Sequence, residues 1–557
     1  MIDKYVRTDF KSYEDFILNF KIDVPDNFNF AFDIVDAIAD KTPDKKAMVW
    51  CNEEGEEKTF TFKDMKEKSA QTANFLQSLG IKKGDRVLLM LKRRYEYWFC
   101  ALALHKIGAV LIPGTHLLTH KDVVYRVHSA GIKMIIAVYE ERMTEILKDV
   151  RKETPELHQI ISANGVYEDW IDYSKEIEKF SKTFNRPQGK DANTKDDPFL
   201  LYFTSGTTGM PKMVMHNYSY PLGHILTAKF WQNLTPESLH LTVAETGWAK
   251  ASWGKIYGQW ICEACIFVYD FERFHYQELL KKVSDYKITS FCAPPTVYRY
   301  MIKEDFSKYD LSHLKYAETA GEPLNPEVFN QFKEMTGLEI KEGFGQTETV
   351  CMIATFPWVK SKPGALGKPS AGWDLDIVDD ENKPCLPNQE GHLIVRTHHK
   401  NPTGLFCGYY KDEPLTQKIW SQGIYNTGDK VYKDEDGYFW FIGRADDVIK
   451  SSGYRIGPFE VESALMEHPC VLECAITAVP DEVRGFVVKA TIILAKGYKA
   501  SEELKKELQE HVKKITAPYK YPRIIDFVDE LPKTISGKIK RAHIRESDKN
   551  RKSNKEK

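Results

Sequence analysis

The feature that most constrains the fold is an alternation of short apolar runs with amphipathic helical patterns over about the first two hundred residues. Residues 87–91 and 109–113 are predicted to be buried strands, and residues 95–107 between them show a helical pattern that ends at Gly108. Residues 134–138 continue the series. Repeated strand, helix, strand units predict largely parallel sheets that are covered by helices on both faces.

The pattern changes toward the C-terminus. From about Gly364, short strands separated by turn residues predict a small β-rich subdomain. The last hundred or so residues alternate helical and strand patterns, which is typical of a small α+β module. We therefore predict an α/β protein with a large N-terminal domain of stacked αβ subdomains plus the β-rich subdomain, residues 1–445. A small mobile C-terminal domain, residues 446–557, follows.

The composition excludes several classes of protein. The 557 residues include 78 basic and 80 acidic side chains, so the formal net charge is −2. This balance argues against a nucleic-acid binder held by bulk electrostatics, and we expect no nucleic-acid partner. The N-terminus lacks the apolar core of a signal peptide, and His105 and Lys106 interrupt the richest apolar stretch. We therefore expect no membrane span and a cytosolic protein.

The ten cysteines are too few and too scattered for a disulfide scaffold. Cys262 and Cys265 form a CxxC pattern, but it lies in an apolar and aromatic stretch with no second pair of metal-ligating residues nearby. We predict that these cysteines are buried small hydrophobic residues rather than a zinc or redox site.

The most informative segment for function leads from an apolar strand into six consecutive small or hydroxyl residues, with Lys212 shortly after them. The six residues are Thr204, Ser205, Gly206, Thr207, Thr208 and Gly209. Because such a loop carries few β-carbons, its backbone N–H groups can approach an anion closely, and the hydroxyls and the lysine add donors and positive charge. The pattern predicts a loop that binds phosphate.

The spacing does not match the phosphate loop of P-loop kinases and ATPases. That motif, GxxxxGK[ST], places a lysine directly after a glycine and a magnesium-binding hydroxyl after the lysine, whereas here two residues separate Gly209 from Lys212 and a methionine follows. A flexible Ser/Thr/Gly linker is a further alternative. It is disfavoured because linkers are not normally set between two apolar runs.

The segment 202–212 resembles the signature of the adenylate-forming superfamily, which includes acyl-CoA synthetases, luciferases and peptide-synthetase adenylation domains. Further segments resemble the other motifs of this superfamily in the same order; they are 320–324, 342–348, 425–429, 443–447 and 531–538. The N-terminal part looks like the medium-chain acyl-CoA synthetase branch. The resemblance implies an enzyme that converts a small carboxylic acid, ATP and CoA into acyl-CoA, AMP and diphosphate through an acyl-adenylate.

The resemblance also implies roles for individual residues. Lys538 is the catalytic lysine, Thr347 contacts the α-phosphate, and Glu348 positions Mg²⁺. The ATP-binding residues are Thr204, Ser205, Gly206, Thr207, Thr208, Gly209, Lys212, Gly321, Glu322, Pro323, Glu342, Gly343, Phe344, Gly345, Gln346, Asp429, Arg444 and Arg455. Lysines, hydroxyls and a bound metal suit this chemistry. The anionic acid must approach a triphosphate carrying about four negative charges, and the site has to offset the repulsion between them.

Taken alone, several of these residues have a simpler interpretation. Asp429 is a common turn residue, Arg444 and Arg455 fit surface charges, and Lys538 lies in a basic stretch. Their assignments therefore depend mainly on the resemblance. Because one site must carry out adenylation and then thioester formation, the resemblance also implies rotation of the C-terminal domain. Asp446 is the hinge candidate, and Asp447 and Lys450 are near alternatives. Rotation would bring a CoA-binding face into place, formed by Ser452, Gly453 and Tyr454.

One position bears on the acid. In the acetate-specific branch a tryptophan closes the acyl pocket where this chain has Gly345, so the sequence predicts room for a short-to-medium-chain, branched or aromatic acid. The resemblance also places Trp248, Ala249, Lys250 and Ala320 around the acyl group, with Gly345. Lys250 is unexpected there, because a cation at an apolar pocket needs a partner or must extend outward.

Three other functions remain open. An adenylation enzyme that loads a carrier-protein pantetheine would use the same motifs, but no carrier domain follows Lys538. A non-enzymatic nucleotide-binding protein is expected to lack Lys538 or Glu348, and both are present. A luciferase-like oxygenase shares the motifs. The sequence leaves open whether the chain forms a homo-oligomer.

Overall fold

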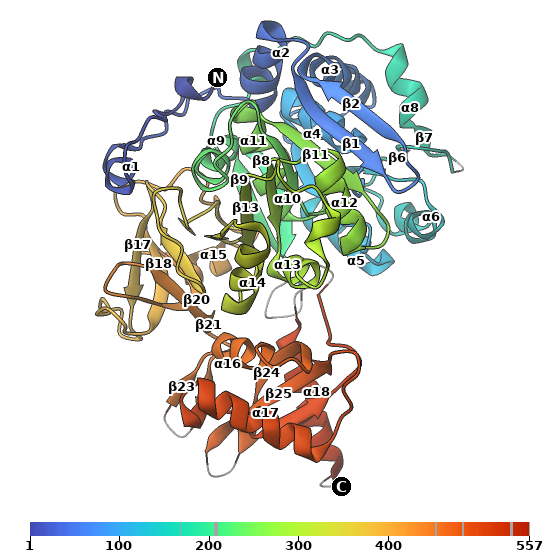
Figure 1. Ribbon diagram of the computed structural model, residues 1–557. Coiled ribbons are helices and arrows are strands. Elements are labelled where there is room, and N and C mark those ends of the chain that lie inside the picture. The colour runs from blue at the N-terminus through green and yellow to red at the C-terminus, as the bar shows by residue number, and fades with distance from the viewer. Residues whose placement is uncertain (168, 205–209, 452–453, 482–483, 535–538, 556–557) are drawn as a thin grey trace.

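The structure, a computed structural model, describes every residue except 168, 205–209, 452–453, 482–483, 535–538 and 556–557. The chain forms a large N-terminal body and a smaller C-terminal body below it (Figure 1). Both bodies combine helices with sheets. The predicted α/β class, with a large N-terminal part and a smaller C-terminal part, is confirmed.

The first two hundred residues or so contribute a seven-stranded sheet in the order β7-β6-β5-β3-β4-β8-β9. Its strands are β3 (Arg86–Met90), β4 (Val110–Pro113), β5 (Ile132–Ala137), β6 (Gln159–Ser162), β7 (Ile171–Asp172), β8 (Pro198–Thr204) and β9 (Lys212–Asn217). All neighbouring strands are parallel except β8 and β9, which form an antiparallel pair. The strands expected at 87–91, 109–113 and 134–138 correspond to β3, β4 and β5.

The connecting helices follow from local sequence. Every residue of α4 (Glu96–Ile107), which joins β3 to β4, is buried, and the helix ends at Gly108 with φ 87°. Glycine is favoured there because it has no β-carbon to strain a left-handed backbone. α5 (His120–Ala130) begins with a capping box in which Thr119 and Asp122 satisfy each other's backbone N–H groups. Such crossover helices allow consecutive strands to run parallel.

A second, 14-stranded sheet runs in the order β17-β18-β20-β21-β16-β15-β14-β13-β12-β10-β11-β1-β2, with β19 beside β20. Its N-terminal strands are β1 (Lys46–Asn52), β2 (Glu57–Thr61), β10 (Leu239–Thr242), β11 (Cys265–Asp270), β12 (Ser290–Ala293), β13 (Tyr316–Ala320) and β14 (Ile340–Phe344). The remaining strands are β15 (Ile353–Ala354), β16 (Ala365–Pro369), β17 (Asp374–Val378), β18 (Gly391–Arg396), β19 (Trp420–Ser421), β20 (Ile424–Lys433) and β21 (Phe439–Arg444). The section from β1 to β14 is parallel, and the section from β15 to β21 is antiparallel. This antiparallel section is the β-rich part expected from the sequence.

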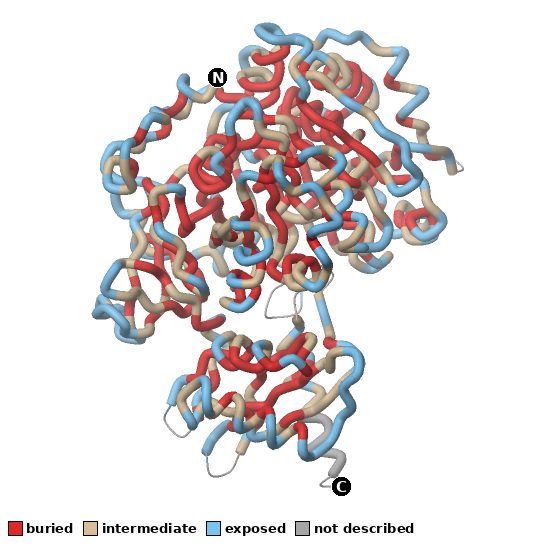
Figure 2. Tube along the Cα trace, viewed as in Figure 1, coloured by how far each residue is buried: buried red, intermediate tan, exposed pale blue. Residues whose placement is uncertain are grey.

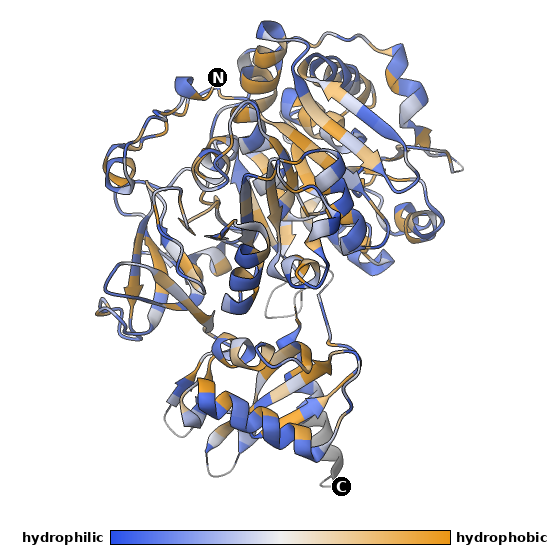
Figure 3. Ribbon diagram, in the orientation of Figure 1, coloured by the Kyte–Doolittle hydropathy of each residue, from blue (hydrophilic) through white to orange (hydrophobic). Residues whose placement is uncertain are grey.

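The smaller body contains the sheet β24-β25-β26 and the hairpin β22-β23. Its strands are β22 (Ile449–Ser451), β23 (Tyr454–Ile456), β24 (Val471–Asp481), β25 (Gly485–Leu494) and β26 (Ile524–Phe527). Its helices are α16 (Pro458–Met466), α17 (Glu502–Ile515) and α18 (Arg541–Lys555). Each body has its own buried interior, visible as separate red regions in Figure 2, and the hydrophobic segments in Figure 3 follow the same strands.

The other α-helices lie in the large body. They are α1 (Tyr13–Asn19), α2 (Ala37–Lys41), α3 (Phe62–Ser78), α6 (Glu141–Leu147), α7 (Val150–Glu153), α8 (Tyr173–Glu176), α9 (Tyr220–Ile225), α10 (Ala249–Gly254), α11 (Tyr257–Ile261), α12 (Tyr276–Asp285), α13 (Pro295–Met301), α14 (Pro326–Thr336) and α15 (Glu413–Ile419). Of the helices that the structure describes, none has the length and apolarity needed to span a bilayer. All ten cysteines are free. Cys262 is buried in a small apolar cluster, as predicted, whereas Cys265 is only half-buried, against a different apolar cluster.

Candidate functional site

The predicted phosphate loop connects β8 to β9 at the edge of the seven-stranded sheet. Thr204, the last residue of β8, lies opposite Lys212, the first residue of β9. The antiparallel register therefore brings the two ends of the loop side by side. Of the residues between them, Ser205, Gly206, Thr207, Thr208 and Gly209 lie outside the described residues.

The segment that carries Thr347 and Glu348 follows β14 and is held by β9. The ring Nε2 of His216 on β9 lies 2.8 Å from the carbonyl oxygen of Thr347. Burial lowers the pKa of His216 to about 4, so the ring is neutral at pH 7, and we assign its single N–H to Nε2 because a carbonyl accepts there. His216 thus fixes the backbone of Thr347 beside the strand that leaves the loop. Sequence reasoning missed His216, since a lone histidine in a strand carries no motif.

Tyr409 links Glu348 to Lys212. Its hydroxyl donates to Oε1 of Glu348 at 2.8 Å, and the Nζ of Lys212 lies 5.1 Å from the centroid of its ring. Burial and the nearby Glu348 carboxylate raise the pKa of Tyr409, so the hydroxyl remains a donor. The structure therefore brings together two predicted residues, Lys212 and Glu348, through a tyrosine that the sequence analysis did not identify.

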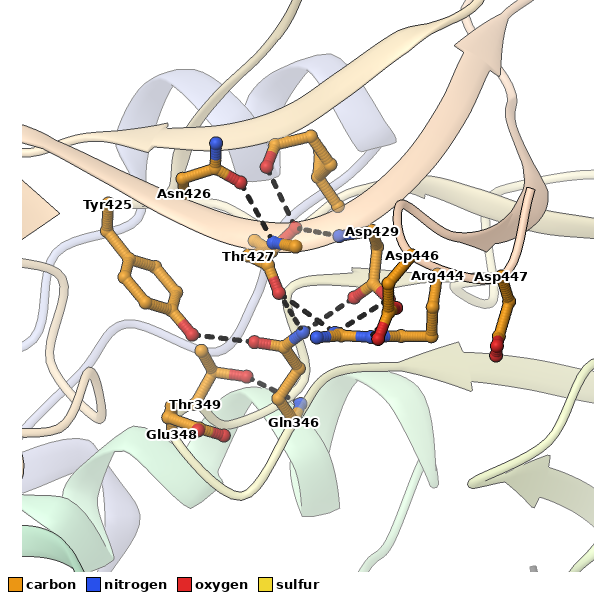
Figure 4. A network of polar contacts seen from close by, with 12 residues as sticks. Gln346, Glu348, Thr349, Tyr425, Asn426, Thr427, Asp429, Arg444, Asp446 and Asp447 are labelled. Carbon is orange, nitrogen blue, oxygen red and sulfur yellow. Dashed lines mark hydrogen bonds and ion pairs between the residues drawn. The ribbon is translucent and has the colours of Figure 1, made fainter. Parts of the chain in front are cut away.

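Asp429 lies at the centre of a buried polar network (Figure 4). The Nε2 of Gln346 donates to its Oδ2 at 2.6 Å, and the Nη1 of Arg444 donates to its Oδ1 at 3.1 Å. Gln346 also donates to the carbonyl oxygen of Thr427 at 2.8 Å and accepts from the hydroxyl of Tyr425 at 2.7 Å. Both N–H donors of the Gln346 amide are thus used within the protein. Gln346 orients Asp429, and the structure gives its side chain no free donor for ATP.

The segment expected to act as a hinge begins at the edge of this network. The Nε of Arg444 lies 4.0 Å from Oδ1 of Asp446. The next residue, Asp447, pairs instead with Arg545 of α18, with 2.5 Å between Oδ1 and Nη1. Two successive carboxylates are therefore held by different bodies, and the change of partner falls between Asp446 and Asp447.

Arg455 lies apart from the other predicted ATP-binding residues. Its Nη2 pairs with Oδ2 of Asp380 at 2.6 Å, and Lys430 contacts the same carboxylate. Lys430 directly follows Asp429 on β20, and successive side chains of a strand point to opposite faces. Arg455 therefore contacts the face of the sheet away from Asp429. In this orientation of the smaller body Arg455 pairs with Asp380, and its contact with ATP stays a prediction.

The segment expected to contact adenine follows β13. Gly321 has φ 100°, a left-handed conformation that favours glycine. The Oε2 of Glu322 accepts from the hydroxyl of Thr296 at 2.9 Å, and Pro323 is half-buried beside it. Glu342 lies beneath this segment on β14, where its Oε1 accepts from the backbone N–H of Leu324 at 3.4 Å. Burial raises the pKa of Glu342 to about 8, so it is mostly neutral at pH 7 and supports the segment from inside the protein.

We expect Glu342→Gln to leave the KM for ATP within about threefold of wild type and to flatten the pH dependence of stability. The folded state of wild type keeps a proton up to about pH 8, whereas an unfolded glutamate releases it near its ordinary pKa of 4.5. The free energy of unfolding therefore falls as pH rises between these values, and glutamine removes this loss. Thermal melts at about pH 5 and about pH 8 measure the slope.

A matched control is Glu318→Gln. Glu318 is buried on the neighbouring strand β13, its pKa is also raised to about 8 by burial, and it is not among the predicted ATP-binding residues. Glu318→Gln should flatten the pH dependence of the free energy of unfolding in the same way, without any change in the KM for ATP. An unaltered slope in Glu342→Gln, or a large loss of ATP affinity, would contradict the interpretation.

The predicted acyl-binding residues gather where α10 meets the end of β13. Trp248 precedes α10, and Ala249 is its first residue. The Nζ of Lys250 donates to the carbonyl oxygen of Ala320 at 2.8 Å. The carbonyl of Ala320 gives the ammonium group the partner that a cation beside an apolar pocket requires. The hydrogen bond also connects α10 to the end of β13, which leads into the segment expected to contact adenine.

The space beside Gly345 is occupied by Trp253. A β-carbon on Gly345 would lie 2.5 Å from Cη2 of Trp253 and 2.4 Å from the carbonyl oxygen of Val350. Gly343 is covered in the same way by Trp231, whose ring lies 6.1 Å from that of Trp253. The sequence predicted space for the acid beside Gly345. Trp253 of α10 takes up part of that space.

Known proteins resemble the whole chain. The acyl-coenzyme A synthetase ACSM3 of Mus musculus is 42% identical over 550 residues, which cover 97% of this chain and 94% of that protein. The synthetase ACSM5 of Homo sapiens is 41% identical over 535 residues, which cover 94% of this chain and 91% of that protein. Both are named mitochondrial, so the expectation of a cytosolic protein is wrong. That expectation was based on the absence of the apolar core of a secretory signal peptide. Mitochondrial transit peptides have no such core either, so its absence does not distinguish the two locations.

Family models and solved structures agree with these relatives. The AMP-binding enzyme model matches residues 35–410, and the model of the AMP-binding enzyme C-terminal domain matches residues 460–538. The crystal structure of the anthranilate CoA ligase AuaEII in complex with anthranoyl-AMP superposes with a TM-score of 0.87 at 29% identity, covering 95% of this chain and 99% of that one. The predicted membership of the adenylate-forming superfamily is confirmed. By sequence and by fold, the chain belongs to the AMP-binding enzyme family.

Proposed function

We propose that the protein is an AMP-forming acyl-CoA synthetase that converts a carboxylic acid, ATP and CoA into acyl-CoA, AMP and diphosphate. The observation that carries the proposal is the convergence of the Glu348–Tyr409–Lys212 group with the network around Asp429. Gln346 and Glu348 lie two residues apart, so one short segment after β14 contributes to both. The names of the relatives, acyl-coenzyme A synthetases and an anthranilate CoA ligase, support the same reaction.

Each group suits one part of ATP. Asp429 is a carboxylate, a group that accepts hydrogen bonds from hydroxyls such as those of ribose, and Gln346 and Arg444 hold it in place. Lys212 lies at one end of the predicted phosphate loop, and the backbone of Thr347 contacts the same strand, β9, through His216. Their ammonium and hydroxyl groups suit contact with the triphosphate. Positioning of the acid oxygen in line with the α-phosphorus, and compensation of charge there, account for most of the catalysis expected of such a site.

Magnesium is the metal that fits this site. Mg²⁺ in nucleotide sites binds one or two protein carboxylates together with substrate phosphates and water. Glu348 supplies one carboxylate, and within the described part of the chain there is no group of three or more His, Cys, Asp or Glu residues that would form a protein-only metal site. Bound there with ATP, Mg²⁺ would offset charge on the phosphates.

We further propose that the smaller body, from residue 446, rotates about Asp446 between adenylation and thioester formation. The different partners of Asp446 and Asp447 support this position for the pivot. Tyr454, half exposed and stacked on Tyr519 with 4.0 Å between ring centroids, belongs to the face proposed to meet CoA. Ser452, Gly453 and the catalytic Lys538 of this body lie outside the described residues.

The function is tested by diphosphate release with straight, branched and aromatic acids, from acetate to decanoate and benzoate, with and without CoA. We expect acid-dependent release, acyl-CoA only when CoA is present, and poor use of acetate. Acid-dependent release that gives no thioester with CoA, but does acylate a carrier-protein pantetheine, would favour the carrier-loading alternative. ATP turnover that does not depend on any of the acids would exclude both the CoA ligase and the carrier-loading function.

Trp253 should limit the size of the acid. Trp253→Ala removes the indole that covers Gly345, so we expect kcat/KM for acids longer than the preferred one, or with an aromatic ring, to rise about tenfold relative to butyrate. Trp253→Phe should give a smaller shift in the same direction. The measurement is kcat/KM across the acid panel. An identical acid profile in Trp253→Ala would show that this indole does not border the acyl group.

A further inference from the structure

Tyr409 connects two charged residues that the fold supplies from different sheets. Lys212 begins β9 of the seven-stranded sheet, and Glu348 follows β14 of the 14-stranded sheet. The hydroxyl of Tyr409 lies 2.8 Å from Oε1 of Glu348, and its ring centroid lies 5.1 Å from the Nζ of Lys212. Only 6% of Tyr409 is exposed, so this contact is not an incidental surface encounter.

The segment that carries Tyr409 is itself held in place by backbone hydrogen bonds. The N–H of Cys407 donates to the carbonyl of Met215 at 2.7 Å, and the N–H of Tyr410 donates to that of Met213 at 2.8 Å, so the segment lies along β9. The N–H of Tyr409 donates to the hydroxyl of Thr416 at 2.9 Å. The phenol therefore projects from a backbone that is fixed on both sides.

The same segment holds Glu348 at two points. The N–H of Phe406 donates to the backbone carbonyl of Glu348 at 2.8 Å, while Tyr409 donates to its carboxylate. One hydrogen bond fixes the main chain and the other fixes the rotation of the side chain. Oε1 of Glu348 is thus engaged by the protein, and Oε2 is the oxygen left for a ligand.

The ring of Tyr409 also separates opposite charges. The ammonium group of Lys212 lies over the Tyr409 ring, while the carboxylate of Glu348 accepts from the Tyr409 hydroxyl. A direct pair would reduce the charge that each residue could offer to a ligand. A cation over an aromatic face keeps its positive charge while it is held in position.

We propose that Tyr409 is a positioning residue that orients Glu348 toward a magnesium ion and keeps Lys212 available for the triphosphate. The proposal rests on the proposed function, because the ligand it serves is magnesium-bound ATP. Groups that orient a metal-binding carboxylate typically change metal affinity about 10- to 100-fold when they are removed. The hydroxyl and the ring have separable roles, which variants can distinguish.

The first test is Tyr409→Phe, which removes the hydroxyl and keeps the ring. We expect the Mg²⁺ concentration that gives half-maximal ATP–diphosphate exchange to rise about tenfold, with recovery of most of the rate at excess Mg²⁺. The KM for the acid should not change. A readout independent of activity is Mn²⁺ binding in the presence of a non-hydrolysable ATP analogue, followed by electron paramagnetic resonance, where affinity should fall about tenfold.

Tyr409→Leu removes the ring as well and should also weaken binding of the ATP analogue measured by calorimetry without metal, which Tyr409→Phe should leave unchanged. Tyr410→Phe is the matched control, because the neighbouring Tyr410 contacts Lys411 through its ring whereas the Tyr409 hydroxyl donates to Glu348. It should behave as wild type. Thermal melts confirm that each variant is folded.

Wild-type Mg²⁺ and Mn²⁺ dependence in Tyr409→Phe would overturn the proposal, as would an equal loss of rate at every Mg²⁺ concentration. Failure of the proposed function would look different. In that case wild type itself would show no acid-dependent exchange.

Discussion

Lys538→Ala should reduce acyl-adenylate formation by about 10²- to 10⁴-fold while thioester formation from supplied acyl-AMP stays within about threefold of wild type. A positive charge beside the reacting phosphorus lowers the barrier only while the acyl–phosphate bond forms. Once the adenylate exists, the proposed rotation would present the other face of the smaller body for attack by the CoA thiol. The two half-reactions are measured separately, the first by ATP–diphosphate exchange and the second by acyl-CoA formation from synthetic acyl-AMP.

Lys540→Ala provides the control for this prediction. Lys540 is an exposed lysine of the same basic stretch, and its backbone N–H donates to the carbonyl of Pro532. If a basic surface were sufficient, Lys540→Ala would resemble Lys538→Ala; we expect it to resemble wild type. An equal loss of both half-reactions in Lys538→Ala would contradict a lysine that acts in only one of them.

Asp429→Asn should raise the Kd for ATP by about 100-fold, because it removes a charged acceptor and places an amide against two existing donors. Gln346 and Arg444 both donate to this carboxylate in the structure. The more specific expectation concerns the ribose. Wild type should bind 2′-deoxy-ATP or 3′-deoxy-ATP more weakly than ATP, and Asp429→Asn should lose most of that discrimination.

Calorimetry with the three nucleotides measures this coupling directly. Asp446→Asn is a suitable control, since Asp446 is an exposed carboxylate near Arg444 that does not join the buried network. It should preserve the preference for ATP over the deoxy analogues. If Asp429→Asn also preserves that preference, Asp429 supports the network but does not receive the ribose.

Much of the architecture could be predicted because it depends on local patterns. The runs that became β3, β4 and β5 are continuous and apolar, as strands buried on both faces must be, and Gly108 ends α4 where the backbone becomes left-handed. Contacts between distant segments carry no such pattern. Trp253 and Gly345 are almost a hundred residues apart, and nothing in either segment indicates that the indole covers the glycine.

The candidate site shows the same division. Motif residues such as Lys212, Glu348 and Asp429 could be identified in advance because their chemistry requires particular types at particular spacings. Their supporting residues could not. Tyr409 makes its contacts through one hydroxyl and one ring face, and His216 through one ring nitrogen. Either residue is common inside proteins without such contacts. The partner of Arg455 depends on how the smaller body is oriented, which no local pattern encodes.

The change of partner between Asp446 and Asp447 has a mechanical consequence. A reorientation of the smaller body can be absorbed by the few backbone torsions around one peptide unit, with both hydrophobic interiors left intact. Two contacts between the bodies are polar: the ion pair of Arg455 with Asp380, and the hydrogen bond from the buried side-chain amide of Asn325 to the carbonyl of Ser463. An exposed ion pair such as that of Arg455 with Asp380 contributes little free energy, so this contact opposes such a swing only weakly.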